Sequence, residues 1–456
     1  MEVLIFEEHA SVLPHWRRRG VRGRTLVYLD AHLDLQCSSE QRMRRLRACR
    51  GAEELAALEK AHHLLPDGDS SYGIEDFLYA ASQLGMIDRL IWVAPPHVEI
   101  AGSSAVMNEL EQMDGVTRDE IASFHHTDQG VLRGRLLGLD LTVCRDSDLA
   151  ALDLPGDALI DIDADYFVEV PGDRAWIDPL RVFERLDALP IRPAWISIAR
   201  SVSSGYMPLH LRFVADYLAA AWRGDAEGVA HYGRLFAAVE ALADERVVEA
   251  AERLRHEQRA FPDCAATAQL LAEAEPDPVR ARSCRMRAAE LDPGYREDLL
   301  RRVCELRCRR RSVRGDDVSE LERELEQPEL DAQSRALVHV ALGFVYCAAE
   351  RMRGALEHYR AGAAILGPHP ELGLEIGRRL LASPRPEAAE SFLRVALQDD
   401  RTHSSACVAL GALALRRGEP ARAVAALREA QARAPAWREP RRLLAAVEEQ
   451  LDRSAL

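Results

Sequence analysis

Two short stretches of this 456-residue chain gather side chains that commonly bind metal ions. LVYLDAHLDL and ALIDIDADYF together contain Asp30, His32, Asp34, Asp161, Asp163 and Asp165. Residues i, i+2 and i+4 of a strand point to one side of a sheet, so each trio projects together while its strand continues. Five carboxylates and an imidazole at adjacent strand ends are electrostatically costly without a cation. Oxygen and imidazole donors favour a hard or borderline divalent ion, Mn²⁺ more than a thiolate-binding metal.

The N-terminal segment IFEEHASVLPHW supplies a further candidate ligand. A β-rich run over residues 3–6 leads to Glu8 and His9, and a helical pattern begins at Ala10. His9 therefore follows a strand end, where open α/β sheets bind their ligands. Either aspartate-rich motif alone is also typical of helix N-caps. The two motifs together, each behind an apolar strand, favour a metal site.

The elements that position these residues belong to an α/β domain, which we predict over residues 1–225. Compact apolar runs predict strands at residues 3–6, 26–29, 90–93, 159–162 and 195–198. Helical patterns lie between several of them, around residues 40–64 and 74–84. Short apolar strands that alternate with helices predict a mainly parallel sheet covered on both faces.

The remaining residues, 226–456, have a helical composition and a period of 34. Three columns of residues keep this step: Gly343, Gly377 and Gly411; Ala355, Ala389 and Ala423; Tyr359, Leu393 and Leu427. A 34-residue helix–turn–helix unit with small residues where its helices touch is the TPR signature. We predict an all-α TPR superhelix, clearest over residues 336–437, with an irregular helical insert at 296–335. The concave face of such an array commonly holds a peptide or protein segment.

The amino-acid composition limits the kinds of binding partner and the cellular compartment that we expect for this protein. The net charge of −15 argues against a general nucleic-acid or anionic-membrane binder and suits a basic partner. Nine scattered cysteines contain no CxxC pair, and the start is acidic where a secretory signal would be basic. No apolar run approaches the length of a membrane span. We therefore predict reduced thiols and a cytoplasmic location.

The order of these motifs resembles the arginase–deacetylase, or ureohydrolase, superfamily, and in particular its peptide-arginase branch. The resemblance covers roughly residues 1–215 and rests on EEHASVLPHW, YLDAHLDL, LIDIDADYF and ISIARSVSSGYMP. Glu8-His9 resembles the family's first ligand element, residues 30–34 match its DAHxD motif, and residues 161–163 resemble its DxD motif. The resemblance implies two Mn²⁺ ions, with no organic cofactor, held by His9, Asp30, His32, Asp34, Asp161 and Asp163.

That branch converts arginine side chains of ribosomally made precursor peptides to ornithine and urea. The resemblance therefore implies a hydrolase in which two metals activate a water that attacks the guanidinium carbon. Its partners would be an Arg-containing precursor peptide and, on the TPR face, the peptide's leader or a partner protein. Removing the repeats would then weaken peptide binding.

The sequence departs from the family at several positions. Asp165 comes one residue early and precedes Tyr166-Phe167, so the ligand pair is either Asp161 with Asp163 or Asp163 with Asp165. No motif matches the family's proton-shuttling histidine or its guanidinium-binding acid. Candidates for the shuttle are His62, His63, His125 and His126. Candidates for catalysis or substrate binding are Asp165, Glu75 and Tyr206.

Two other functions fit the same residues. The metal site could act on a small guanidino compound, or on an acyl-lysine as in related deacetylases. Alternatively, the chain could be a non-catalytic TPR scaffold whose α/β domain has lost its activity. All six ligand types are present, which favours an enzyme. The sequence has no GxSxG elbow, P-loop or GxGxxG motif that would indicate another chemistry.

Overall fold

A computed structural model describes residues 1–99, 104–128, 130–169, 174–308, 315–326 and 330–455. In these residues a mainly parallel sheet has the strand order β1-β10-β7-β2-β3-β6-β5-β4. Its strands are β1 (Glu2–Phe6), β2 (Arg24–Leu29), β3 (Ile87–Val93), β4 (His125–His126), β5 (Leu132–Leu136), β6 (Leu139–Cys144), β7 (Leu159–Asp163) and β10 (Trp195–Ala199). Only β4 and β5, at one edge, run antiparallel to their neighbours. A separate antiparallel pair joins β8 (Val168–Glu169) to β9 (Arg174–Ala175).

The five predicted strands are confirmed, each extended by one to three residues. Strands β4, β5 and β6, at and next to one edge of the sheet, were not predicted. In β5, Gly134, Arg133 and Arg135 interrupt the apolar pattern. A tight turn joins β5 to β6 at Leu137 and Gly138, both of which have positive φ. Such a turn matches the twist of a two-stranded hairpin.

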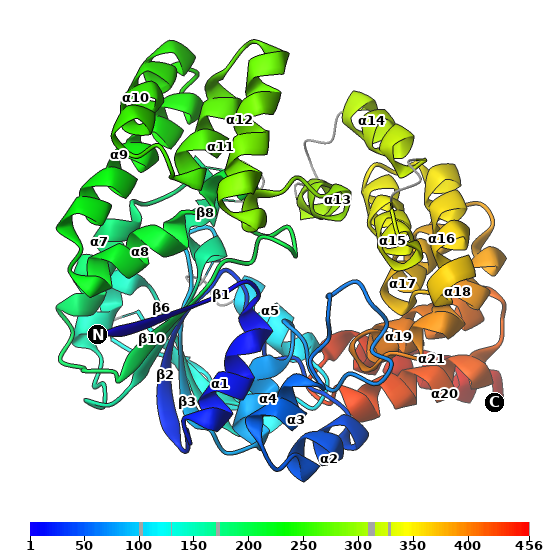
Figure 1. Ribbon diagram of the computed structural model, residues 1–456. Coiled ribbons are helices and arrows are strands. Elements are labelled where there is room, and N and C mark those ends of the chain that lie inside the picture. The colour runs from blue at the N-terminus through cyan, green and yellow to red at the C-terminus, as the bar shows by residue number, and fades with distance from the viewer. Residues whose placement is uncertain (100–103, 129, 170–173, 309–314, 327–329, 456) are drawn as a thin grey trace.

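Helices cover both faces of the sheet, as predicted (Figure 1). The helices of this half are α1 (Val12–Arg18), α2 (Glu40–Ala48), α3 (Ala52–Ala56), α4 (Phe77–Gln83), α5 (Ser104–Gln112), α6 (Arg118–Ser123), α7 (Pro179–Asp187) and α8 (Val214–Arg223). Apolar residues of α1 to α5 form one core with one face of the strands. Those of α7 and α8 form a second core with the other face. The alternation of strand side chains thus fills two cores.

The helical pattern predicted around residues 40–64 is confirmed only in part, as the two helices α2 and α3. The chain turns extended at Cys49 after α2, and α3 ends at Ala56. Leu64 lies beyond these helices and is fully buried, in the hydrophobic core of the helical half. Burial against a distant part of the chain has overridden the local helical preference.

The second half is helical throughout its described residues. Its helices are α9 (Ala226–Ala243), α10 (Val247–Ala260), α11 (Ala265–Ala274), α12 (Pro278–Leu291), α13 (Leu299–Cys308), α14 (Gly315–Leu325), α15 (Ala332–Ala348), α16 (Met352–Leu366), α17 (Pro370–Leu381), α18 (Ala389–Ala396), α19 (Asp400–Arg416), α20 (Pro420–Arg433) and α21 (Arg438–Ala455). The pairs α15–α16, α17–α18 and α19–α20 repeat the predicted 34-residue unit. The predicted insert includes α13 and α14, while residues 309–314 and 327–329 lie outside the described residues.

The repeated small residues sit where paired helices touch. Ala355, Ala389 and Ala423 are fully buried. A Cβ added at Gly377 would lie 2.5 Å from Leu393, and one at Gly411 would lie 2.9 Å from Leu427. These helices therefore form TPR-like pairs, with glycine where the partner leucine comes closest.

Replacing Gly377 by alanine should destabilise the helical half, although alanine is more favourable than glycine inside a helix by about 1 kcal/mol. The new methyl group would overlap the fully buried Leu393 side chain, and such overpacking typically costs about 1–3 kcal/mol. Thermal unfolding followed by circular dichroism should show a lower midpoint for Gly377→Ala than for Gly51→Ala. A Cβ at Gly51 would have no neighbour within 4 Å. An equal midpoint for both variants would show that this contact is looser than described.

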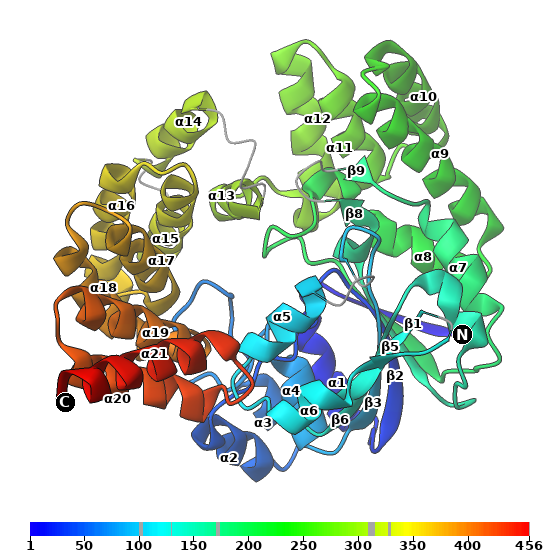
Figure 2. The same cartoon turned by 180° about the vertical axis from the view of Figure 1, so that it is seen from behind.

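The helical half curves back onto the α/β half. Figures 1 and 2 show α19 to α21 beside the helices α2 to α6, at the end of a long arc. The Gly115 amide donates to the Arg433 carbonyl at 2.7 Å, and the Ala436 amide donates to the Val116 carbonyl at 3.1 Å. His369 Nε2 lies 2.8 Å from the Leu64 carbonyl oxygen. Among the described residues, no helix combines the length and the apolar character needed to cross a bilayer.

Candidate metal centre

His9 is the centre of the first group of candidate ligands. It follows β1 in a short 3-10 turn and is only 1% exposed. Its Nδ1 lies 3.0 Å from Asp30 Oδ2 and 3.1 Å from Asp163 Oδ2. These three residues offer donor atoms that all lie within 4.8 Å of one another. The strand ends of β1, β2 and β7 therefore converge as the sequence predicts.

A second group shares Asp30 with the first. His32 Nδ1 lies 3.0 Å from Asp165 Oδ2 and 3.5 Å from Asp30 Oδ1. Asp30, His32 and Asp165 also have donor atoms within 4.8 Å of one another. Two three-residue groups that share one carboxylate are suited to two neighbouring ions.

The backbone explains why these residues meet. Asp30 comes directly after β2, and Asp163 is the last residue of the adjacent parallel strand β7. The 3-10 turn Ala164–Phe167 then brings Asp165 back toward His32. Asp34 and Ser201 both have positive φ, 47° and 49°, which is uncommon for residues other than glycine. Strained backbone of this kind is concentrated at functional sites.

Asp161 lies behind His9 rather than in either group. It sits inside β7, paired in register with Tyr28 and Ser197. Its Oδ2 lies 2.8 Å from His9 Nε2, and the Ser197 hydroxyl donates to its Oδ1. Metal-binding histidines usually have their second nitrogen held by a carboxylate in this way. The position of Asp161 is that of a residue that orients His9.

Further hydrogen bonds fix the remaining carboxylates. The Ser201 hydroxyl donates to Asp163 Oδ2 at 2.6 Å, and the Asp165 amide donates to Asp163 Oδ1 at 3.0 Å. Asp34 lies next to the His9 group, with its Oδ2 3.8 Å from His9 Nδ1. The same oxygen accepts a hydrogen bond from the Tyr28 hydroxyl at 2.9 Å. These contacts hold the donor atoms in place before any ligand arrives.

Burial and the neighbouring charges shift the pKa values of several residues in this cluster. Burial raises the pKa of Asp165 to about 7, helped by Asp163 and Asp30. Burial and the Asp30 carboxylate also hold the pKa of Asp34 well above its usual range. Burial disfavours the His9 cation, but the Asp161, Asp163 and Asp30 carboxylates outweigh it and raise the pKa of His9 well above its ordinary value. A bound cation would neutralise the same carboxylates.

The donor set fits divalent metal ions of the hard or borderline class. Each group combines two carboxylates with one imidazole and contains no sulfur. The residues that would hold two ions are His9, Asp30, Asp163, His32 and Asp165, with Asp34 next to them. Manganese stays our prediction for the metal, since ligand type favours it without selecting it.

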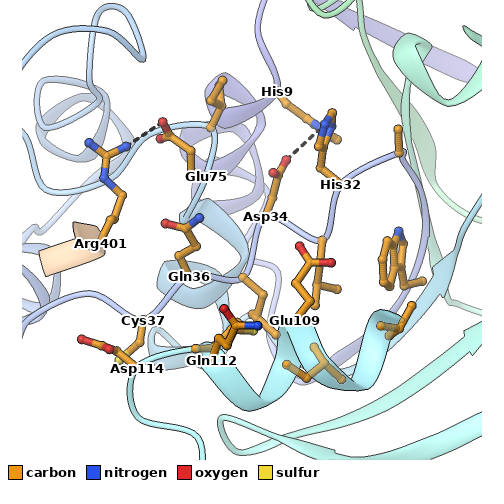
Figure 3. Close-up of a pocket in the computed structure, with 18 of the residues that line it drawn as sticks. His9, His32, Asp34, Gln36, Cys37, Glu75, Glu109, Gln112, Asp114 and Arg401 are labelled. Atoms are coloured by element: carbon orange, nitrogen blue, oxygen red, sulfur yellow. Dashed lines mark hydrogen bonds and ion pairs between the residues drawn. The ribbon is translucent and has the colours of Figure 1, made fainter. Parts of the chain in front are cut away.

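A cavity of about 330 Å³ opens over these ligands. Figure 3 shows His9, His32 and Asp34 on one side of it and Gln36, Glu75 and Glu109 around the others. The acidic residues of its lining are Asp34, Glu75, Glu109, Asp114, Asp163, Asp165 and Asp400. One arginine, Arg401, also lines it, and its Nη1 donates to Glu75 Oε1 at 2.6 Å. An acidic lining of this kind favours a cationic substrate.

Two of the predicted substrate-binding residues, Glu75 and Tyr206, lie in the wall of the cavity. The Tyr206 ring lies 4.7 Å from the His32 ring, centre to centre. The Glu75 carboxylate forms an ion pair with the Arg401 guanidinium. His63 lies 6.0 Å from Tyr206, ring to ring, and its Nε2 accepts from Arg307 at 2.8 Å.

None of the four shuttle candidates lines this cavity. His62 lines a different hollow beside Glu8. His125 and His126 lie on the edge strand β4, where they line a hollow with α5 and α6. His63 is the shuttle candidate whose ring contacts Tyr206, and the Tyr206 ring in turn contacts His32.

The fold also adds residues that the sequence does not indicate. Asp400, Arg401, Ser404 and Ser405 of α19 line the cavity, although they lie far from the ligands along the chain. Glu109 of α5 lines it too and makes no ion pair within the described residues. Neither segment has a motif that would have identified it. Ser201, in the serine-rich loop after β10, donates directly to Asp163.

A second cavity of about 470 Å³ continues from the first toward the helical half. The two share the lining residues Gln36, Glu75, Tyr206, Arg401 and Ser405. Its other walls come from α13, α15 and α17, including Arg307, Phe344 and Arg378. We call this second cavity the repeat groove. It connects the inner side of the TPR-like helices to the candidate metal centre.

Comparisons with known proteins add little to this description. No protein-family model and no curated protein matches the chain. Among solved structures, the crystal structure of PilW, a widely conserved type IV pilus biogenesis factor, shares 12% identity at a TM-score of 0.29, over 47% of this chain and 98% of that one. The crystal structure of the APC/C hetero-tetramer Cut9-Hcn1 shares 15% identity at a TM-score of 0.28, over 52% of this chain and 48% of that one. These overlaps are too slight to carry an argument about function.

Proposed function

We propose that this protein is a metal-dependent hydrolase that converts arginine side chains of a peptide to ornithine and urea. The observation that supports it best is the pair of ligand groups, sharing Asp30, at the base of an acidic cavity. When bound, divalent ions would supply Lewis acidity and a nucleophile at neutral pH. We propose Asp163 and Asp165, rather than Asp161 and Asp163, as the ligands from the second motif.

The chain's own residues would bind and orient the guanidinium group. Glu109 presents a carboxylate from the cavity wall, and a carboxylate can hold a flat guanidinium by paired hydrogen bonds. The Tyr206 ring stands beside His32 and limits the space over it. Burial, His62 and Arg307 hold the pKa of His63 well below its ordinary value, so this shuttle candidate is neutral near neutral pH and is not suited to deliver a proton to the leaving amine.

The repeat groove favours a peptide over a small guanidino compound. A free amino acid would occupy only the first cavity, whereas the two connected cavities extend from the ligands to the inner face of α15 and α17. Concave faces of this repeat class commonly hold extended segments. A peptide in the groove would place one side chain toward the metal centre, and its backbone would remain among the helices.

Mass spectrometry tests the proposed reaction. An Arg-containing peptide incubated with Mn²⁺-loaded protein should lose one CH₂N₂ unit per converted arginine, with an equal amount of urea released. Protein stripped with a chelator should be inactive, and adding Mn²⁺ back should restore the reaction. Free arginine, agmatine and an acetyl-lysine peptide tested in parallel separate the other substrates. If only one of these compounds is converted, that compound rather than a peptide arginine is the substrate. If the protein binds no metal, the non-catalytic TPR scaffold is favoured instead.

A further inference from the structure

A second cluster of reactive side chains lies in the helical half, apart from the metal centre. Cys264 precedes α11 directly, His231 belongs to α9 and Glu257 belongs to α10. Cys264 Sγ lies 3.3 Å from His231 Nε2, and His231 Nδ1 lies 2.8 Å from Glu257 Oε2. A thiol, an imidazole and a carboxylate in this order are the arrangement that activates a nucleophile. None of the three lines the cavity over the metal ligands.

The imidazole is held firmly in this orientation. Glu257 is only 2% exposed, and Arg234 donates to both of its oxygens, at 2.5 and 3.1 Å. The Phe261 ring covers His231, with ring centres 4.1 Å apart. His231 Nε2 therefore stays directed at the sulfur, because Nδ1 is engaged by the carboxylate.

The surroundings of the sulfur favour its ionised form. Burial opposes ionisation, but His231 and Thr267 outweigh it, so the pKa of the Cys264 thiol lies below its ordinary value. A position at the start of a helix adds to this stabilisation. Cys264 is half-buried, which leaves the sulfur partly accessible.

We propose that Cys264, His231 and Glu257 form a nucleophilic thiolate site that reacts with hydroperoxides. The Cys264 thiolate attacks one oxygen of hydrogen peroxide, the O–O bond breaks, and hydroxide leaves with the electron pair. His231 transfers its proton to that hydroxide, giving water, and the sulfur becomes a sulfenic acid. The thiol is oxidised by two electrons and the peroxide is reduced by two. Glu257 orients His231 and stabilises its cation.

The full-length protein can be tested with a pulse of hydrogen peroxide followed by trapping of sulfenic acid with dimedone. Cys284 is an internal control, because it is also half-buried but its thiol pKa is raised by burial and Glu275. Peptide mass spectrometry should show Cys264 labelled faster than Cys284, on the order of tenfold. Exchanging His231 for glutamine should reduce the Cys264 rate to that of Cys284.

Two results would overturn the proposal. One is equal labelling of Cys264 and Cys284 in the unmodified protein. The other is an unchanged Cys264 rate in His231→Gln. If that variant fails to fold, Glu257→Gln provides the same comparison, because it leaves the ring in place but removes the charge that stabilises its cation.

Discussion

Replacing Asp165 by asparagine should remove one of two bound metal ions and lower kcat/KM for an arginine peptide by more than about a thousandfold. Asp165 lies in the ligand group of His32 and Asp30, and a neutral amide is a much weaker ligand than a carboxylate. Changes behind the ligands typically cost about 10–100-fold, so loss of a ligand should cost more. Elemental analysis of the purified variant, together with the urea assay, gives both quantities.

The matched control is the same substitution at Asp161. This carboxylate touches His9 on the nitrogen that faces away from Asp30 and Asp163, so Asp161→Asn should keep both metals and lose about 10–100-fold in kcat/KM. Thermal unfolding checks that both variants remain folded. If Asp161→Asn loses a metal and Asp165→Asn does not, the ligand pair is Asp161 with Asp163.

Filling the repeat groove should impair peptide turnover and spare small substrates. Ala348, at the end of α15, lines the repeat groove but not the cavity over the metal ligands. Tryptophan at this position would occupy the space that the peptide backbone needs. We expect the KM for an arginine peptide to rise about tenfold or more, which corresponds to a loss of about 1.4 kcal/mol or more of binding free energy. Turnover of any small guanidino compound that the enzyme accepts should stay unchanged.

The neighbouring residue provides the control for this experiment. Ala349 is exposed and does not line the groove, so Ala349→Trp adds the same bulk outside it. Its peptide KM should match that of the unmodified protein. Equal peptide kinetics for all three proteins would show that the substrate does not lie along α15, and would favour a small molecule bound only over the metal ligands.

The local elements of the fold could be predicted because their signals are local. The strands that end just before Asp30 and at Asp163 are short apolar runs, and the carboxyl ends of parallel strands meet at one edge of the sheet. The 34-residue glycine and alanine columns mark helix contacts within one unit, where a larger side chain would overlap Leu393 or Leu427. In both cases the residues that interact are close in sequence or repeat at a fixed step.

The division of roles among the aspartates depended on register between strands. Asp161, Asp163 and Asp165 follow one another at steps of two, so their spacing alone leaves two ligand pairs possible. Pairing of β7 with β2 and β10 places Asp161 between Tyr28 and Ser197, under His9. The 3-10 turn after β7 then turns Asp165 toward His32.

The shape of the candidate substrate site was decided by contacts between the two halves. Sequence by itself determined five of the strands, the candidate ligands and the repeat unit, because each depends on neighbouring or periodic residues. Only the tertiary structure placed Arg401 against Glu75 and joined the repeat groove to the metal centre. Arg401 and Glu75 lie more than 300 positions apart in the sequence. They meet because α19 to α21 lie beside α2 to α6 (Figures 1 and 2).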